Sequence, residues 1–129
     1  MKKLISMAVI CLVTFFLFVN FMPVRQQKTA KTTQVRIFTI NKGKMNEFVS
    51  AWQKGVYPLR VKHGFTIEKA WVVRGKNKFI RILSYDGPES FEVKDSLYYA
   101  SQARITLQPN PADYIADAEN YFIDNALPE

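Results

Sequence analysis

The amino-acid sequence predicts an α+β domain of the ferredoxin-like type, with its strands and helices in the order β-α-β-β-α-β. Three observations predict it. Runs of β-branched and aromatic residues recur at four places after residue 34, two segments between them carry apolar residues at helical spacing, and glycine or proline separates the segments. At 129 residues the chain has room for one such domain.

A long apolar segment precedes this domain. Residues 4–24 contain no charged side chain, and about twenty apolar residues in a helix can cross the hydrocarbon core of a membrane. The end of the segment is bulky and lacks the small-residue site of a cleaved signal peptide. We therefore expect residues 1–24, which include the single cysteine Cys11, to form an uncleaved transmembrane signal anchor. Secretion after cleavage is the alternative.

The charges that flank this segment leave its orientation nearly balanced. Lys2 and Lys3 stand before it, and Arg25, Lys28 and Lys31 stand after it. The early position and the Met-Lys-Lys start resemble bacterial export signals, which favours a single-pass protein of the cell membrane with its domain outside the cytoplasm. The polar residues 25–34 are interpreted as a linker, and residues 35–129 as the domain.

The first half of the domain begins with a strand over residues 35–40, which Gly43 ends. A helix follows, because apolar residues then recur every three or four positions. These residues are Met45, Phe48, Val49, Trp52, Val56 and Leu59. Pro58 lacks an N–H donor and is expected to bend or split this helix near Gly55. Gly64 is expected to end the helix with a positive φ.

The second half contains the remaining strands. Residues 65–73 alternate between apolar and polar, residues 75–78 suit a hairpin turn, and residues 79–85 form the third strand. A second helix is expected to open at residues 86–89 and to run to about residue 99. Ser101 can cap a further short turn, and residues 110–113 can start another. Residues 119–123 are the expected fourth strand, although a helix also fits them.

Two helices can cover only one face of this sheet, yet the strands are apolar on both faces. In the third strand, Phe79, Leu83 and Tyr85 point one way, and Ile80 and Ile82 point the other way. Strands that are apolar on both faces need cover on both, and a bare apolar face exceeds what a monomer usually exposes. The simplest cover is a second copy, so the sequence predicts a homodimer that packs sheet against sheet.

Charge and composition argue against several classes of function. From Thr32 onward there are 13 basic and 11 acidic residues, an excess too small and scattered for a nucleic-acid-binding surface. Nucleophile triads, phosphate-binding loops and nucleotide motifs are absent from the sequence. Asp113, Asp117 and Glu119 fit a solvated face better than a metal site, because no histidine accompanies them. We therefore expect no metal and no cofactor.

An ordered set of short motifs resembles the NIPSNAP family over residues 35–123. The motifs are Arg36-Ile37-Phe38-Thr39-Ile40, Gly43-Lys44, Pro58-Leu59-Arg60, Lys62-His63-Gly64-Phe65, Ala70-Trp71, Ser84-Tyr85-Asp86-Gly87, and Tyr98-Tyr99-Ala100-Ser101 with Arg104. The resemblance implies a ferredoxin-like subunit that pairs into a dimeric α/β barrel. Two features depart from the family: Gln102-Ala103 replaces a proline and an acid, and an export anchor is unusual. The family is poorly defined in function, and the residues of its haem-degrading relatives have no matching positions here.

The sequence offers one candidate catalytic residue and a set of candidate ligand-binding residues. His63 can move a proton, or it can stabilise the end of a helix. Arg36 and Arg81 lie in otherwise apolar strands and either hold an anion or pair with a carboxylate such as Asp86 or Glu68. The full candidate ligand-binding set is Arg36, Trp71, Arg81, Tyr85, Tyr98, Tyr99 and Arg104. Tyrosines and tryptophans of this kind also serve in cores and interfaces.

The leading functional hypothesis is a membrane-anchored domain that binds a small apolar or anionic organic molecule in a pocket between the sheet and the helices. One alternative is a protein-interaction or scaffold module without turnover. Another is a cofactor-independent monooxygenase or isomerase, in which His63 moves a proton while Arg36, Arg81 or Tyr85 stabilises an oxyanion. The sequence leaves open whether the protein is an enzyme, because fold alone does not determine function.

Overall fold

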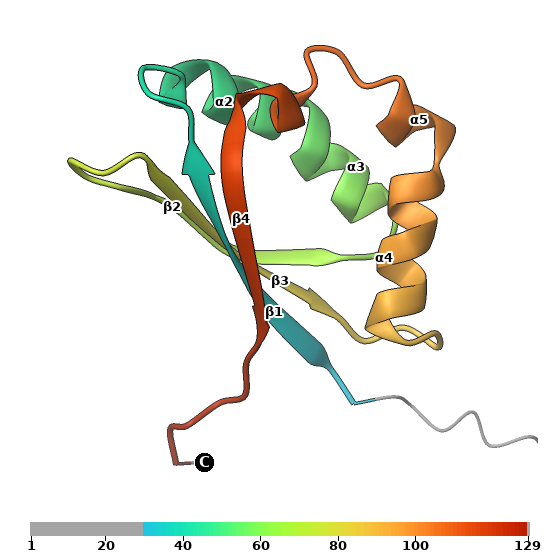
Figure 1. Cartoon of the computed structure of the whole chain (residues 1–129). Coiled ribbons are helices and arrows are strands. Elements are labelled where there is room, and N and C mark those ends of the chain that lie inside the picture. Colours follow the sequence, from blue (N-terminus) through green and yellow to red (C-terminus); the bar gives the residue numbers. More distant parts are fainter. Residues whose placement is uncertain (1–29, 129) are drawn as a thin grey trace, which may run out of the picture.

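The computed structural model describes residues 30–128, which fold into one four-stranded sheet with its helices on one face (Figure 1). The expected anchor, with Cys11, and the first part of the expected linker lie outside the described residues. Among the described residues no helix combines the length and apolarity needed to span a membrane.

The elements follow the predicted β-α-β-β-α-β order, with short additional turns. They are β1 (Thr32–Ile40), α2 (Met45–Ala51), the π-helical segment η1 (Trp52–Val56), α3 (Tyr57–Lys62), β2 (Thr66–Val73), β3 (Lys78–Tyr85), α4 (Phe91–Ala100), α5 (Gln102–Ile105), the 3-10 turn η2 (Pro111–Tyr114) and β4 (Ile115–Phe122).

The strands are arranged β2-β3-β1-β4, and all neighbouring pairs are antiparallel. Two boundaries differ from the predictions. Strand β1 begins at Thr32, inside the expected linker, because Thr32 and Thr33 pair with the end of β3. Strand β4 begins at Ile115, four residues before the expected start, because this polar segment pairs with β1 along its length. Pairing therefore extends both strands beyond their apolar runs.

The first helical segment is split as the proline predicts. Pro58 lies in the first turn of α3, where a missing N–H is tolerated. The turn before it widens into η1, in which the Tyr57 N–H bonds to the Trp52 carbonyl five residues earlier. The expected glycine cap is also confirmed: Gly64 has φ +87°, and its N–H bonds to the Val61 carbonyl.

The second helix starts later than predicted. Ser90 is the residue before its first turn, and the Ser90 hydroxyl accepts a hydrogen bond from the Val93 N–H. A serine in this position satisfies one of the free N–H groups at a helix start. Ser101 and Asn110 cap α5 and η2 in the same way, as predicted. These caps fix where α4 and α5 turn toward the sheet.

The sheet separates its side chains onto two faces. On β1, alternate residues from Gln34 to Ile40 are buried beneath the helices, and Val35 and Ile37 point to the opposite face. The apolar residues of the helix face form two clusters. One contains Phe38, Ile40, Phe48, Trp52, Val56 and Phe79, and the other contains Phe65, Leu83, Tyr85, Phe91 and Tyr98. Buried arginines contact both clusters, and they define the candidate site.

Candidate functional site

Three arginines are buried on the helix face of the sheet. Arg36 on β1 and Arg81 on β3 are directly paired across the two central strands, and Arg60 reaches them from α3. Arg60 and Arg81 are 0% and 1% exposed, respectively. Side chains of this type are almost never fully buried unless they are paired, so their partners decide what the cluster can do.

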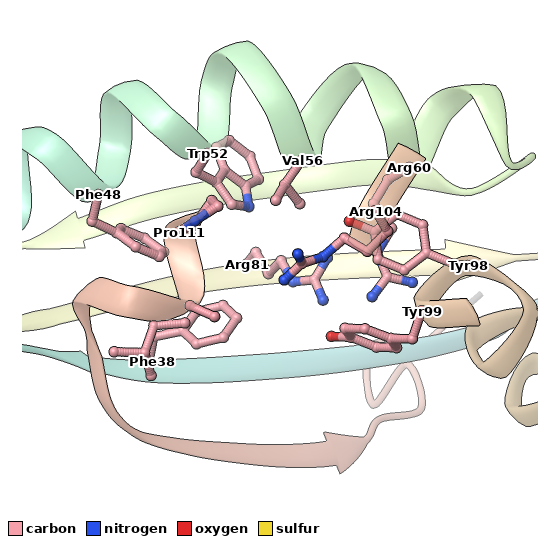
Figure 2. Close-up of a pocket in the computed structure, with 12 residues that line it drawn as sticks. Phe38, Phe48, Trp52, Val56, Arg60, Arg81, Tyr98, Tyr99, Arg104 and Pro111 are labelled. Atoms are coloured by element: carbon pink, nitrogen blue, oxygen red, sulfur yellow. The ribbon is translucent and has the colours of Figure 1, made fainter. Parts of the chain in front are cut away.

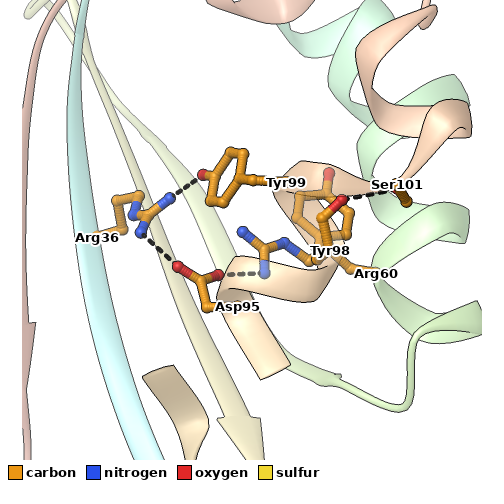
Figure 3. Close-up of polar contacts among 6 residues, drawn as sticks. All are labelled: Arg36, Arg60, Asp95, Tyr98, Tyr99 and Ser101. Carbon is orange, nitrogen blue, oxygen red and sulfur yellow. Dashed lines mark hydrogen bonds and ion pairs between the residues drawn. The ribbon is translucent and has the colours of Figure 1, made fainter. Parts of the chain in front are cut away.

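Asp95 of α4 is the carboxylate at the centre of this cluster (Figure 3). Its Oδ1 lies 2.5 Å from Arg60 Nη1, and its Oδ2 lies 3.8 Å from Arg36 Nη2. Arg36 Nη1 also donates a hydrogen bond of 2.5 Å to the Tyr99 hydroxyl. One carboxylate therefore links β1, α3 and α4 through two buried cations.

The carboxylates proposed from the sequence do not occupy this position. Asp86 is exposed, and Glu68 pairs with Lys31 at 2.5 Å and accepts a hydrogen bond from Ser84. The interpretation that either of them neutralises Arg36 or Arg81 is therefore wrong. Asp95 pairs with Arg36 across the space between α4 and the sheet, a contact that no local pattern indicates.

Arg81 lacks an ionic partner among the described residues. Its Nε and Nη1 atoms are buried and have no hydrogen-bond acceptor in that part of the chain. Burial, and then the charges of Arg60 and Arg36, together lower the pKa of Arg81 to about 9. A buried cation without a partner is costly, and Arg81 is therefore the group in this cluster most in need of an anion.

A pocket opens beside Arg81, between the sheet and the helices (Figure 2). Aromatic side chains of Phe38, Phe48 and Trp52 form one part of its wall. The other part is polar and contains Arg60, Arg81, Tyr98, Tyr99 and Arg104. The centre of a water molecule can occupy about 40 Å³ of the pocket, and the surrounding free space of about 340 Å³ includes open solvent. The free space therefore suits a small ligand.

Unpartnered hydrogen-bond donors gather in the wall of this pocket. Besides Arg81, the indole Nε1 of Trp52 and the hydroxyl of Tyr98 are buried without a partner in the described part of the chain. Native proteins leave few such groups unsatisfied, so each one calls for an explanation. With Arg60, whose Nε is also buried without a partner there, four such residues around one pocket indicate a bound molecule that accepts hydrogen bonds.

The two adjacent tyrosines have opposite electrostatic environments. Burial raises the pKa of Tyr98, although the guanidinium of Arg60 lies 3.6 Å from the centre of its ring. Burial also raises the pKa of Tyr99, but the charges of Arg36, Arg60 and Arg81 outweigh it and leave this pKa below its ordinary value. The pocket therefore contains one phenol that holds its proton and one that releases it more readily.

The structure brings five of the sequence-predicted residues together. Arg81, Tyr98, Tyr99 and Arg104 line the pocket, and Arg36 is bonded to Tyr99 immediately beside it. Arg104 Nη1 donates a hydrogen bond of 3.1 Å to the Asn110 side-chain oxygen, which positions it on the short α5 turn.

The other three predicted residues lie elsewhere. His63 is half-buried at the end of α3, and its ring stacks edge-on against Tyr98 at 5.5 Å, outside the pocket wall. Burial, and then the charges of Lys94, Arg60 and Lys62, lower its pKa. Tyr85 is buried in the second apolar cluster and donates a hydrogen bond to Glu89. Trp71 is 47% exposed on the face of the sheet opposite the helices.

Arg60 and Trp52 are site residues that the sequence analysis did not select. Phe48, Trp52, Val56 and Arg60 follow one another at intervals of four, and all four line the pocket. The sequence signal that could have identified Arg60 is its place at the next interval of four after three apolar residues. The π-helical segment brings Arg60 onto the buried face, where a regular helical count had placed Leu59.

The fold and the pocket define a class: a ferredoxin-like α+β domain with a buried, arginine-rich pocket beneath its helices. No family model and no curated protein matches the sequence. The structure is similar to an uncharacterized NIPSNAP domain protein from Burkholderia xenovorans, with 18% identity, a TM-score of 0.66, and coverage of 76% of this chain and 99% of that chain.

Two further solved structures show the same fold. A NIPSNAP family protein from Agrobacterium tumefaciens strain C58 has 15% identity and a TM-score of 0.66 over 74% of this chain and 85% of that chain. A candidate antibiotic biosynthesis monooxygenase from Nitrosomonas europaea has 11% identity and a TM-score of 0.59 over 78% of this chain and 95% of that chain. The resemblance predicted from the motifs is thus confirmed in the fold, which is the fold of solved NIPSNAP family proteins.

Replacing Asp95 by asparagine tests the central ion pairs. Asp95→Asn keeps the shape of the side chain and leaves Arg36 and Arg60 without their shared counter-charge. We expect the free energy of unfolding to fall by about 3 kcal/mol, as for other broken buried ion pairs, measured by urea denaturation of the full-length chain in detergent. Asp86→Asn is the matched control and should change stability by less than about 0.5 kcal/mol. Equal effects of the two substitutions would contradict the assigned role of Asp95.

Proposed function

We propose that this protein binds a small organic anion, preferably an aromatic carboxylate, in the pocket beside Arg81. The observation that carries this proposal is the buried guanidinium of Arg81, a residue of the pocket wall, which has two buried donor atoms without a partner in the described part of the chain. A ligand carboxylate supplies the missing counter-charge. It also accepts two parallel hydrogen bonds from a planar guanidinium.

The balance of charge supports an anion. Arg36, Arg60, Arg81 and Arg104 carry four positive charges around the pocket, and Asp95 is the one carboxylate that pairs with them among the described residues. The free donors of Trp52 and Tyr98 favour a ligand rich in hydrogen-bond acceptors. A metal cation fits this environment poorly, and the described residues contain no cluster of metal-ligating side chains.

The aromatic wall supports an organic ligand over a simple inorganic ion. Phe48 and Phe79 meet edge to face at 5.1 Å, and Trp52 lies 5.0 Å from Phe79. Such a wall offers a flat apolar ligand contact area, while the arginine end fixes its orientation. A scaffold without a ligand gains nothing from buried free donors, which cost stability. The pocket thus favours binding over the scaffold alternative.

The face of the sheet opposite the helices supports the proposed homodimer. Ile80 lies directly between Trp71 and Ile37 in the strand register, and Tyr121 on β4 is also exposed on this face. Exposed apolar side chains of this kind mark an interaction site, with Glu119 as the polar neighbour of Ile37 on β4. We propose that a second copy covers it and that the two sheets form the dimeric α/β barrel that the resemblance implies.

The apolar segment of residues 4–24 supports membrane attachment through its composition alone. We propose a single-pass protein of the bacterial cell membrane, with the binding domain on the extracytoplasmic side. An external pocket of this kind meets small molecules before they enter the cell.

Benzoate and benzamide test the proposed ligand class, because they share one shape and differ in charge. We expect full-length protein in detergent to bind benzoate, and Arg81→Met to weaken that binding about 10- to 100-fold, the loss of one charged hydrogen-bonding partner. Isothermal titration calorimetry measures both. The exposed Arg74→Met is the matched control and should bind benzoate as the parent does. Equal binding of benzoate and benzamide would refute an anion site.

Substitution of Ile80 tests the dimer. Ile80→Asp places a charge at the centre of the apolar sheet face, and we expect it to convert a dimer into a monomer in native mass spectrometry or analytical ultracentrifugation. Val93→Asp, on the exposed side of α4, is the control and should remain dimeric. A parent protein that sediments as a monomer at high concentration would contradict the proposed assembly.

Membrane attachment is tested by extraction and protease protection. We expect the full-length chain to stay with membranes through an alkaline carbonate wash, and a chain lacking residues 4–24 to be released. Protease added outside intact spheroplasts should digest the domain. A domain that is digested only after lysis would reverse the proposed orientation.

A further inference from the structure

Tyr99 is a pocket residue that is surrounded by arginines. Its hydroxyl accepts the 2.5 Å hydrogen bond from Arg36 Nη1, and this end of the side chain points inward although 42% of the residue is exposed (Figure 3). The guanidinium carbons of Arg60 and Arg104 lie 5.1 Å and 5.7 Å from the centre of its ring. Tyr99 therefore stands at the junction of the ion-pair network and the pocket.

Charged groups face Tyr99 from every element packed around it. Arg36 comes from β1, Arg81 from β3, Arg60 from α3, Arg104 from α5, and Asp95 and Tyr98 from α4 itself. Four cations and one carboxylate leave an excess of positive charge among these groups. Negative charge on the Tyr99 oxygen reduces that excess, which is why its pKa lies below the ordinary value despite its burial.

Tyr98 shows that a position beside Arg60 is not sufficient to lower the pKa of a tyrosine. Its ring also packs against the guanidinium of Arg60, at 3.6 Å, but its hydroxyl is buried without a hydrogen-bond partner in the described part of the chain. Burial consequently dominates and raises its pKa. The two neighbours are thus a natural matched pair, in which one phenol receives a cationic hydrogen-bond donor and the other does not.

Building on the proposed anion site, we propose that Tyr99 is the proton-exchanging group of the pocket, and that anion binding is coupled to protonation of its phenolate. In the empty pocket, at pH values above the pKa of Tyr99, its phenolate offsets the charge of the arginines. A bound carboxylate takes over this role, and the phenolate oxygen then takes up a proton from solvent. No bond to the ligand forms or breaks.

The same geometry handles a ligand that arrives as a neutral weak acid. The O–H bond of the ligand breaks, its proton forms the O–H bond of Tyr99, and the ligand remains as an anion beside Arg81. The pocket thereby converts an acid into its anion without an additional base. His63 is not required for this transfer, because it lies behind Tyr98 and outside the pocket wall.

The coupling has a definite sign. Negative charge on the ligand raises the pKa of Tyr99, so binding takes up a proton at pH values between the pKa of Tyr99 in the empty pocket and its higher pKa in the complex. Benzoate itself stays ionised there, since carboxylic acids titrate near pH 4. Within this window the affinity for benzoate falls with rising pH, by up to about ten-fold per pH unit for one proton. Below the window Tyr99 is protonated with and without ligand, and its ionisation no longer makes the affinity depend on pH.

The test combines two measurements on the full-length protein in detergent. A titration of tyrosinate absorbance without ligand should show one tyrosine that ionises before the others, and this step should vanish in Tyr99→Phe. Calorimetry with benzoate, repeated in buffers of different ionisation heat, should show uptake of up to one proton on the alkaline side. Tyr99→Phe should bind benzoate with clearly less proton uptake in the same window, and the remainder belongs to Arg81, whose pKa is about 9.

Tyr98→Phe is the matched control. It removes the neighbouring hydroxyl and can weaken benzoate binding, but the early tyrosinate step and the proton uptake should both persist. Proton uptake that is as large in Tyr99→Phe as in the parent would assign the proton to another group, such as Arg81, and overturn this inference alone. A parent protein that binds no benzoate would overturn the proposed function, and the ligand-free titration would still decide whether Tyr99 ionises early.

Discussion

The shared ion pair of Asp95 with Arg60 and Arg36 is the interaction on which the rest of the site depends. It joins α4 to α3 and to the central strand β1 at 2.5 Å and 3.8 Å, deep enough that Arg60 has no exposed surface. Two cations at this depth require a counter-charge, because the desolvation of an unpaired charge is very unfavourable. The position of α4 over the sheet is therefore fixed by charge as well as by the apolar residues Phe91 and Tyr98.

The same pair explains why positive charge is in excess around the pocket. Asp95 is already engaged by Arg36 and Arg60, so it offers no further charge to Arg81, which stands directly opposite Arg36 in the sheet. The excess positive charge then stabilises negative charge on nearby groups. In the protein the group affected is the hydroxyl of Tyr99, whose pKa is lowered. In the proposed complex it is the carboxylate of the ligand. The shortage of one carboxylate is thus the feature on which the proposed anion site depends.

Short sequence patterns predicted the turns, helix caps and strand faces, because these depend on residues that are neighbours in the sequence. The positive φ of Gly64, the break before Pro58, the serine and asparagine caps, and the two faces of β3 all follow from neighbouring residues. Asp95 could not be predicted in this way, because 35 positions separate it from Arg60. The early start of β4 was missed for a related reason, since Asp117 and Glu119 are held in the strand by pairing with β1 rather than by their own propensity.

The two faces of the sheet are linked residue by residue. Arg81 lies between Ile80 and Ile82, and Arg36 lies between Val35 and Ile37, so each buried cation beneath the helices is flanked by apolar residues on the opposite face. A slip of one position in the pairing of β1 with β3 would turn arginines toward the apolar face and isoleucines toward Asp95. Both the pocket and the proposed dimer surface thus require the same register. This shared requirement explains how polar residues at the centre of a small sheet are compatible with a single, well-defined fold.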